Sequence, residues 1–193
     1  MGILALIKLP DYVTLASVVC GLSSIILASR QNFVVAALLM LAAVFFDWAD
    51  GEVAGLIKRQ GKFGAELDSL ADAISFGTVP VFFVYFLGVN DLLAIIVFLL
   101  FTSASVLRLA RFNIIEKTPG YYIGLPTTVN GVMIPVLYFL FSWLNISGET
   151  ARWLYLVYLV LASYLMVSSV KTPTLKLIRP LKHSVDEGTA AKP

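Results

Sequence analysis

The sequence predicts an all-α integral membrane protein with six transmembrane helices and a short N-terminal interfacial helix. The chain has 193 residues, of which 59% are apolar and only 13% charged. With a mean hydropathy of +0.89, it lies outside the usual range of soluble domains. Six stretches approach the roughly 20 apolar residues that a helix needs to cross a bilayer core. They are residues 13–29, 33–57, 63–87, 92–112, 127–144 and 153–170.

Helices explain these stretches better than strands do. The strands of a membrane barrel alternate apolar and polar residues over about ten positions, and these stretches do not alternate. Residues 1–8 are too short to span a membrane, so we expect them to form a short helix at the interface. Pro10 is expected to separate this helix from the first span.

Lys and Arg fall mainly on one side of the predicted topology. With both termini in the cytoplasm, twelve of the 14 basic residues lie inside and only Arg30 and Arg152 lie outside, as expected for a multi-pass protein of the cell membrane. Residues 1–182 are predicted to form a single membrane domain, followed by a polar, disordered tail at 183–193. The basic stretch 171–182 is expected to lie against anionic headgroups, although an ordinary positive-inside flank explains it equally well.

The most informative segment places six carboxylates within apolar helices. They are Asp47, Asp50, Glu52, Glu66, Asp68 and Asp72. At 100° per residue, the first two aspartates share one helix face and the last two share a face of the next helix. Because the loop between these helices is short, they must be antiparallel neighbours. All four aspartates then lie about 9 to 16 Å from that loop and can converge on one site. The two glutamates point elsewhere, where they can support the site indirectly.

Four ionised carboxylates in a membrane would cost on the order of 10 kcal/mol before their mutual repulsion is counted. Neither 31–57 nor 63–107 contains a Lys, Arg or His, so the compensating charge has to be imported. An all-oxygen site selects hard divalent ions such as Mg²⁺, Mn²⁺ or Ca²⁺. Two such ions suit four carboxylates, and a pair of ions can clamp a phosphate or pyrophosphate for in-line displacement.

The same segment is rich in glycine, at Gly51, Gly55, Gly61 and Gly64. Each glycine costs helix stability, so this density indicates the close approach of a ligand or of another backbone. Close packing of membrane helices is the alternative explanation.

This pattern resembles the signature of the CDP-alcohol phosphotransferases, membrane enzymes that displace CMP from a CDP-linked substrate. Seven of the eight signature positions are present at the right spacing: Asp47, Asp50, Gly51, Ala54, Gly64, Asp68 and Asp72. The eighth is Gly55, where the family usually has Arg. Either substrate affinity is weaker here, or a nearby basic residue such as Lys58 substitutes.

The resemblance implies roles for these residues. Asp47, Asp50, Asp68 and Asp72 would bind metal, and Asp72 would also be the general base for the incoming hydroxyl. Asp50, Gly51, Ala54, Gly64 and Asp68 would form the nucleotide site. The resemblance also implies a homodimer and phospholipid biosynthesis, with a CDP-lipid as one substrate and no nucleic acid as partner.

Further segments resemble the branch of the family that uses L-serine as acceptor. They are 11–15 with 20–22, 107–113, 124–127 and 165–169. Arg108 and Arg111 lie on one helix face, where two guanidinium groups can hold a carboxylate or phosphate, with Asn113 as a partner. Alternatively, both arginines extend to lipid headgroups.

The predicted reaction is transfer of a phosphatidyl-type group to the serine hydroxyl by a single displacement that releases CMP. Glycerol phosphate or inositol phosphate is the alternative acceptor, although a dianionic phosphate calls for more basic residues than these two arginines. An ion transporter is the distant alternative. The sequence shows no convincing internal repeat, and its aspartates are confined to one helix hairpin, which disfavours transport.

Overall fold

The computed structural model describes residues 2, 6–57, 62–114 and 121–173. Helices make up most of this part of the chain. They are α1 (Leu9–Ser29), α2 (Phe33–Ile57), α3 (Lys62–Ser75), α4 (Val79–Phe86), α5 (Leu92–Ile114), α6 (Thr128–Trp143) and α7 (Gly148–Val167). Two three-residue strands, β1 (Tyr121–Ile123) and β2 (Lys171–Pro173), form a small antiparallel ribbon.

The prediction of a helical, multi-pass membrane protein is confirmed. Within the described residues, five segments are long and apolar enough to cross a membrane, one of them formed by α3 and α4 together. Helix α6 is also apolar but has only 16 residues. At 1.5 Å per residue it is about 24 Å long, somewhat short of the bilayer core.

The third predicted span is not one continuous helix. It breaks between α3 and α4, where the amides of Phe76 and Gly77 both donate to the carbonyl of Asp72. Pro80 lies in the first turn of α4, where its ring would clash with the carbonyl four residues earlier in a continuous helix. The break therefore lies at residues 76–78, one turn after Asp72.

Pro10 lies in the first turn of α1, which begins at Leu9. Its predicted role of separating an interfacial helix from the first span stays a prediction. A proline is compatible with this position, since the first amides of a helix have no partner within it. The predicted interfacial helix falls largely on residues outside the described part of the chain, as does the predicted tail.

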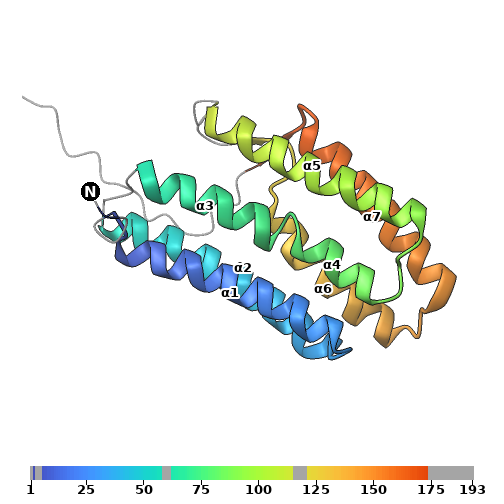
Figure 1. Cartoon of the computed structure of the whole chain (residues 1–193). Helices are drawn as coiled ribbons and strands as arrows, with labels where there is room; N and C mark the ends of the chain where they lie inside the picture. Colours follow the sequence, from blue (N-terminus) through green and yellow to red (C-terminus); the bar gives the residue numbers. More distant parts are fainter. Residues whose placement is uncertain (1, 3–5, 58–61, 115–120, 174–193) are drawn as a thin grey trace, which may run out of the picture.

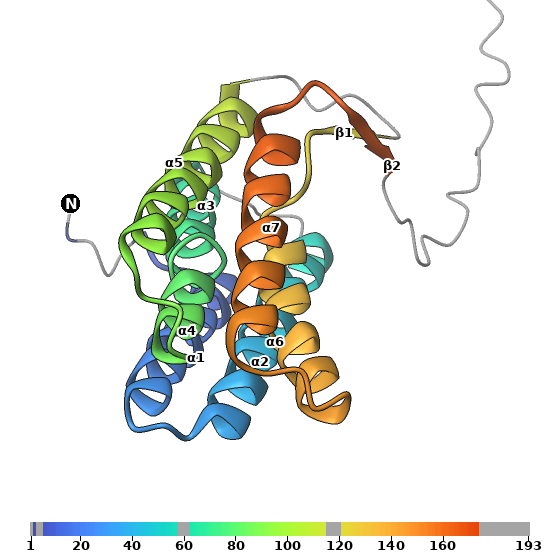
Figure 2. The ribbon, with the colours of Figure 1, turned by 90° about the vertical axis from the view of Figure 1, so that its right-hand side faces the viewer.

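The helices pack side by side as an elongated bundle (Figure 1). The hairpin of α1 and α2 packs against α3 and α6, while α5 packs against α7. The ribbon of β1 and β2 lies at one end of the bundle, beside the ends of α5 and α7 (Figure 2). We call this the ribbon end. The amino end of α3 and the carboxyl end of α2 lie toward it.

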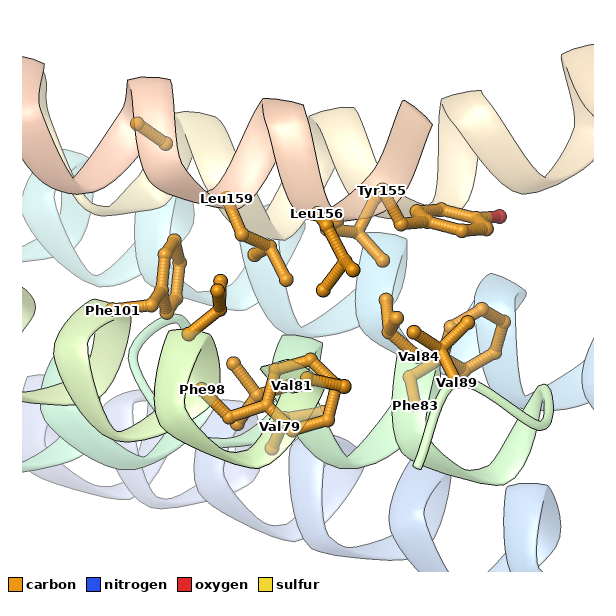
Figure 3. Close-up of a cluster of buried hydrophobic side chains, with 14 of the residues drawn as sticks. Val79, Val81, Phe83, Val84, Val89, Phe98, Phe101, Tyr155, Leu156 and Leu159 are labelled. Carbon is orange, nitrogen blue, oxygen red and sulfur yellow. The ribbon is translucent and has the colours of Figure 1, made fainter. Parts of the chain in front are cut away.

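Apolar side chains of α4, α5 and α7 fill the centre of the bundle. Phe83, Phe101 and Leu159 are fully buried there. Figure 3 shows Leu156 and Leu159 of α7 pointing toward the side chains of α4 and α5. These three helices therefore share one apolar core.

The outer surface of the bundle is apolar as well. Many large side chains, such as Leu92 and Leu99, remain exposed on the outside. This pattern is expected where lipid rather than water surrounds the helices.

Small and polar residues line the buried face of α1 instead. They are Asp11, Thr14, Ser17, Gly21, Ser24 and Ala28, spaced three or four residues apart. Small residues let membrane helices approach closely, and the hydroxyl of Ser24 donates to the carbonyl of Ala36 on α2 at 2.8 Å. The α1 and α2 hairpin is therefore held by close backbone packing.

An ion cluster joins α5 and α7 at the opposite end of the bundle. Arg152 pairs with Asp91 and, at 2.9 Å, with Glu149. The backbone amide of Ala94 donates to the Asp91 carboxylate and, together with Arg152, keeps the pKa of this group below its ordinary value. This cluster lies far along the bundle from the aspartates of α2 and α3.

Gly131 of α6 gives a direct test of the packing beside the helix break. A methyl group at this position would collide with the Phe76 ring and with Val44. We predict that Gly131→Ala lowers the free energy of unfolding by about 1 to 3 kcal/mol, measured by thermal unfolding in one detergent.

Gly51→Ala is the matched control, because a methyl group there meets no atom of the described residues within 4 Å. We expect it to leave the stability unchanged or to raise it by up to about 1 kcal/mol, because alanine favours a helix interior more than glycine does. Equal stability of the two variants would contradict the packing around Gly131.

Candidate functional site

Three aspartates from two neighbouring helices meet near the ribbon end of the bundle. Asp47 and Asp50 come from α2 and Asp68 comes from α3, and one carboxylate oxygen of each lies within 4.8 Å of the other two. Asp50 is only 7% exposed. The spacing predicted this convergence, since each helix turns its acidic face toward the other.

Asp72 lies one turn further along α3 and stands beside Asp47. It is not part of the group of three that can share one ion. Its Oδ2 atom accepts a hydrogen bond from the hydroxyl of Thr127 at 3.4 Å. Its Oδ1 atom is buried and has no hydrogen-bond partner among the described residues. Asp72 therefore has one oxygen that accepts a hydrogen bond from Thr127 and one buried oxygen that accepts none from the described residues.

The donor chemistry of this cluster fits a hard divalent cation. Asp47, Asp50 and Asp68 supply only oxygen atoms, the ligands that Mg²⁺ and Mn²⁺ prefer. Like charges at this spacing repel each other strongly, and a bound cation would remove that repulsion. Asp72 is close enough to Asp47 to join such a site.

Hydroxyl groups from other helices hold three of the four aspartates. Thr14 of α1 donates to Asp50 at 2.5 Å. Thr127, just before α6, donates to Asp72, and Thr128 donates to Asp47 at 3.5 Å. Sequence reasoning gave these threonines no role, although Thr14 and Thr127 lie in segments that resemble the serine-using branch. Threonine is too common in apolar helices for its spacing to have revealed these contacts.

Arg108 of α5 reaches the same region. It is 7% exposed, and its Nη1 atom donates to the hydroxyl of Thr127 at 3.4 Å. The guanidinium group also lies 5.1 Å from the centre of the Phe112 ring. Its positive charge acts on Asp72, so this arginine belongs to the electrostatic environment of the site.

Arg111 has a different set of contacts. Its guanidinium group donates to the backbone carbonyls of Ile123, Met166, Val167 and Ser168 at 2.8 to 3.1 Å. Three of these bonds satisfy carbonyls at the end of α7, which have no partner within the helix. The structure thus uses Arg111 to join α5, β1 and α7, and its predicted contact with an acceptor stays a prediction.

Asn113 lies near the end of α5 and accepts a hydrogen bond from Ser69 of α3 at 3.0 Å. Ser69 directly follows Asp68, so Asn113 is close to the acidic cluster. Its side chain is exposed. The predicted contact of Asn113 with an acceptor stays a prediction.

The glycines of the predicted nucleotide site differ in their surroundings. Gly51 borders open space, because a methyl group there would meet no atom of the described residues within 4 Å. A methyl group at Gly64 would lie 2.8 Å from Oδ1 of Asp11 on α1, so helix packing explains this glycine. The side chains of Ala54 and Lys58, and any consequence of Gly55 in place of Arg, lie outside the described side chains.

The remaining carboxylates of the segment turn away from the cluster. Glu52 and Glu66 are exposed, as their position on the helices predicted. Asp11 of α1 was not predicted as part of the site, yet it is 5% exposed and its charge acts on Asp50. It also accepts a hydrogen bond from the backbone amide of Lys8 at 2.7 Å. Its place in the first turn of α1 explains this contact, since acidic residues favour the start of a helix.

Comparison with known proteins decides the family. Residues 7–169 match the family model described as CDP-alcohol phosphatidyltransferase. The chain belongs to the CDP-alcohol phosphatidyltransferase family. The match covers all of α1 to α7, so both the acidic cluster and the threonines that contact it lie within the family domain.

Several members of the CDP-alcohol phosphatidyltransferase family are similar over most of the chain. The CDP-diacylglycerol-serine O-phosphatidyltransferase of Helicobacter pylori is 37% identical over 184 residues, which cover 93% of this chain and 77% of that protein. The archaetidylserine synthase of Methanothermobacter thermautotrophicus is 34% identical, covering 89% of this chain and 72% of that protein. The corresponding serine enzyme of Bacillus subtilis is 29% identical, with 87% and 91% covered.

The acidic cluster predicts how single substitutions change metal binding. Asp47→Asn, Asp50→Asn and Asp68→Asn each replace a charged ligand by a neutral one. We expect each to weaken the binding of Mn²⁺ at least about tenfold, measured by electron paramagnetic resonance of the free ion.

Asp91→Asn is the matched control, because this aspartate pairs with Arg152 at the other end of the bundle. Its affinity for Mn²⁺ should equal that of the wild type. If all four variants bound Mn²⁺ equally well, the cluster would not be the metal site.

Proposed function

We propose that this protein transfers a phosphatidyl-type group from a CDP-linked lipid to the hydroxyl of L-serine and releases CMP. Membership of the family supports the displacement of CMP. The names of the relatives, CDP-diacylglycerol-serine O-phosphatidyltransferase and archaetidylserine synthase, support serine as the acceptor. Such an enzyme takes part in phospholipid biosynthesis.

The observation that carries this proposal is the arrangement of Asp72 and Arg108 around Thr127. Both side chains contact the same hydroxyl group, each at 3.4 Å. The Arg108 guanidinium group and the Asp72 carboxylate, the candidate base, are therefore separated by no more than two hydrogen bonds. L-serine carries its carboxylate and its hydroxyl on neighbouring carbons, so a single molecule can reach both groups.

In the proposed reaction, Arg108 binds the serine carboxylate. Asp72 accepts the proton of the serine hydroxyl on its Oδ1 atom, as a general base within hydrogen-bond reach. The serine oxygen forms a bond to the lipid-linked phosphorus while the bond from that phosphorus to the CMP oxygen breaks. CMP leaves with the negative charge. Arg111 and Asn113 complete the proposed acceptor site from the ribbon end.

Asp47, Asp50, Asp68 and Asp72 form the proposed metal site. Two divalent ions, Mg²⁺ or Mn²⁺ with Ca²⁺ as a further candidate, would supply neutralisation of the pyrophosphate charge there. The burial of Asp50 and the close spacing of the carboxylates support such a site. Asp50 and Asp68, with Gly51, Ala54 and Gly64, form the proposed nucleotide site.

The proposed setting is the cell membrane, with six spans and both termini in the cytoplasm. Helix α6 would complete the sixth span together with the chain on either side of it. Arg108 and Arg111 lie toward the ribbon end and Arg152 toward the other, which supports a cytoplasmic ribbon end. We also propose a homodimer and one membrane domain over residues 1–182, followed by a disordered tail at 183–193.

The acceptor site favours a carboxylate over a phosphate. Arg111 already donates to four backbone carbonyls, which leaves Arg108 as the main charge for the acceptor. A dianionic acceptor such as glycerol phosphate or inositol phosphate would need more positive charge than this.

A CMP-release assay on the purified protein tests the proposal. We predict release with a CDP-lipid and L-serine in the presence of Mg²⁺ or Mn²⁺, and a loss to background on addition of a chelator. Asp72→Asn should lower kcat at least about a hundredfold, because an amide cannot accept the proton.

Glycerol phosphate and inositol phosphate are the matched acceptors in the same assay. Faster CMP release with either of them would contradict the choice of serine while keeping the reaction class. Activity that survived the chelator would contradict the role of metal.

A further inference from the structure

The hydroxyl of Thr127 is directed to Asp72 and Arg108 rather than to its own helix. Thr127 is the residue before α6, a position where threonine usually accepts a hydrogen bond from an amide of the first turn. Here the side chain makes no such capping bond. Thr127 is fully buried, so its hydroxyl has to find its partners within the protein.

The chemistry of the three groups determines the direction of these hydrogen bonds. A guanidinium group only donates, so Arg108 binds a lone pair of the Thr127 oxygen. An ionised carboxylate only accepts, so the single hydrogen of that hydroxyl goes to Oδ2 of Asp72. Arg108, Thr127 and Asp72 therefore form a chain of hydrogen bonds in which Arg108 donates to Thr127 and Thr127 donates to Asp72.

These hydrogen bonds leave the two carboxylate oxygens of Asp72 in different environments. Oδ2 is bound by Thr127 at 3.4 Å, while Oδ1 is buried and has no partner among the described residues. Both hydrogen bonds of Thr127 are long for an O–H or N–H donor. Hydrogen bonds at catalytic sites often shorten when the substrate binds.

We propose that Thr127 is a positioning residue, which holds the Asp72 carboxylate by Oδ2 so that Oδ1 faces the acceptor hydroxyl. This inference rests on the proposed function, since it assumes that Asp72 takes the acceptor's proton. The hydroxyl fixes the rotation of the carboxylate about its last bond. Without it, the carboxylate can rotate or draw toward Arg108, and fewer substrate complexes are ready to react.

Thr14 and Thr128 offer a comparison within the same protein. Their hydroxyls bind Asp50 and Asp47, which belong to the group of three carboxylates. Loss of either hydroxyl should therefore act mainly on metal affinity. Loss of the Thr127 hydroxyl should act on the rate at saturating metal and serine.

The experiment compares Thr127→Val, which removes the hydroxyl at nearly constant volume, with Thr127→Ser, which keeps it. We expect Thr127→Val to lower kcat about 10-fold to 100-fold, with the KM for serine changed by less than about twofold. Thr127→Ser should recover most of the lost kcat. Thr150→Val, at an exposed position in α7, is the matched control and should keep the wild-type rate.

A thermal-shift measurement checks, independently of the rate, that the variant still folds and binds the CDP-lipid. A CDP-lipid with Mg²⁺ should raise the melting temperature of Thr127→Val as much as that of the wild type, since the hydroxyl is not part of the nucleotide site. If Thr127→Val is not stabilised in this way, Thr127→Ala takes its place in the same comparison.

An unchanged kcat in the variant without the hydroxyl would overturn the proposal. So would a Thr127→Ser variant as slow as Thr127→Val, or a raised KM for serine at an unchanged kcat, which would assign the hydroxyl to acceptor binding through Arg108. A wild-type protein that released no CMP with serine would instead contradict the proposed function. The two failures are therefore distinguishable.

Discussion

The concentration of negative charge between α2 and α3 is the constraint on which the rest of this structure depends. Carboxylates within a membrane are costly, and several of them side by side are more so. The chain nevertheless places Asp47, Asp50 and Asp68 with oxygens within 4.8 Å of one another. An imported positive charge would stabilise such a cluster. The fold therefore has to hold the two helices at matching depth and leave the cluster open to ions and to a charged substrate.

The other helices contribute polar contacts where the acidic cluster needs them. The small-residue face of α1 allows close approach to α2 and α3, and Thr14 on that face binds Asp50. The start of α6 supplies the hydroxyls that reach Asp47 and Asp72. Arg111 fastens the end of α7 to α5 and β1, which fixes the segment that leads into α6. Packing far from the cluster thus determines how its carboxylates are oriented.

Much of this arrangement could be predicted from the sequence, because its signals are local. Apolar stretches indicated the helices, and the spacing of the aspartates indicated their common face and depth. The break between α3 and α4 was missed because hydropathy does not distinguish a bent span from a straight one, although Gly77 and Pro80 were visible. The contacts of the threonines and the four carbonyl contacts of Arg111 could not be predicted. They depend on which helices pack together, and no local pattern specifies that.

Anomalous X-ray scattering from crystals grown with Mn²⁺ and CMP would test the metal site between α2 and α3 most directly. We predict one or two manganese peaks there, at about 2 to 2.6 Å from carboxylate oxygens of Asp47, Asp50 and Asp68, with the CMP phosphate beside them. Manganese bound elsewhere, or carboxylates turned apart with no ion between them, would contradict a metal-dependent transfer at this cluster.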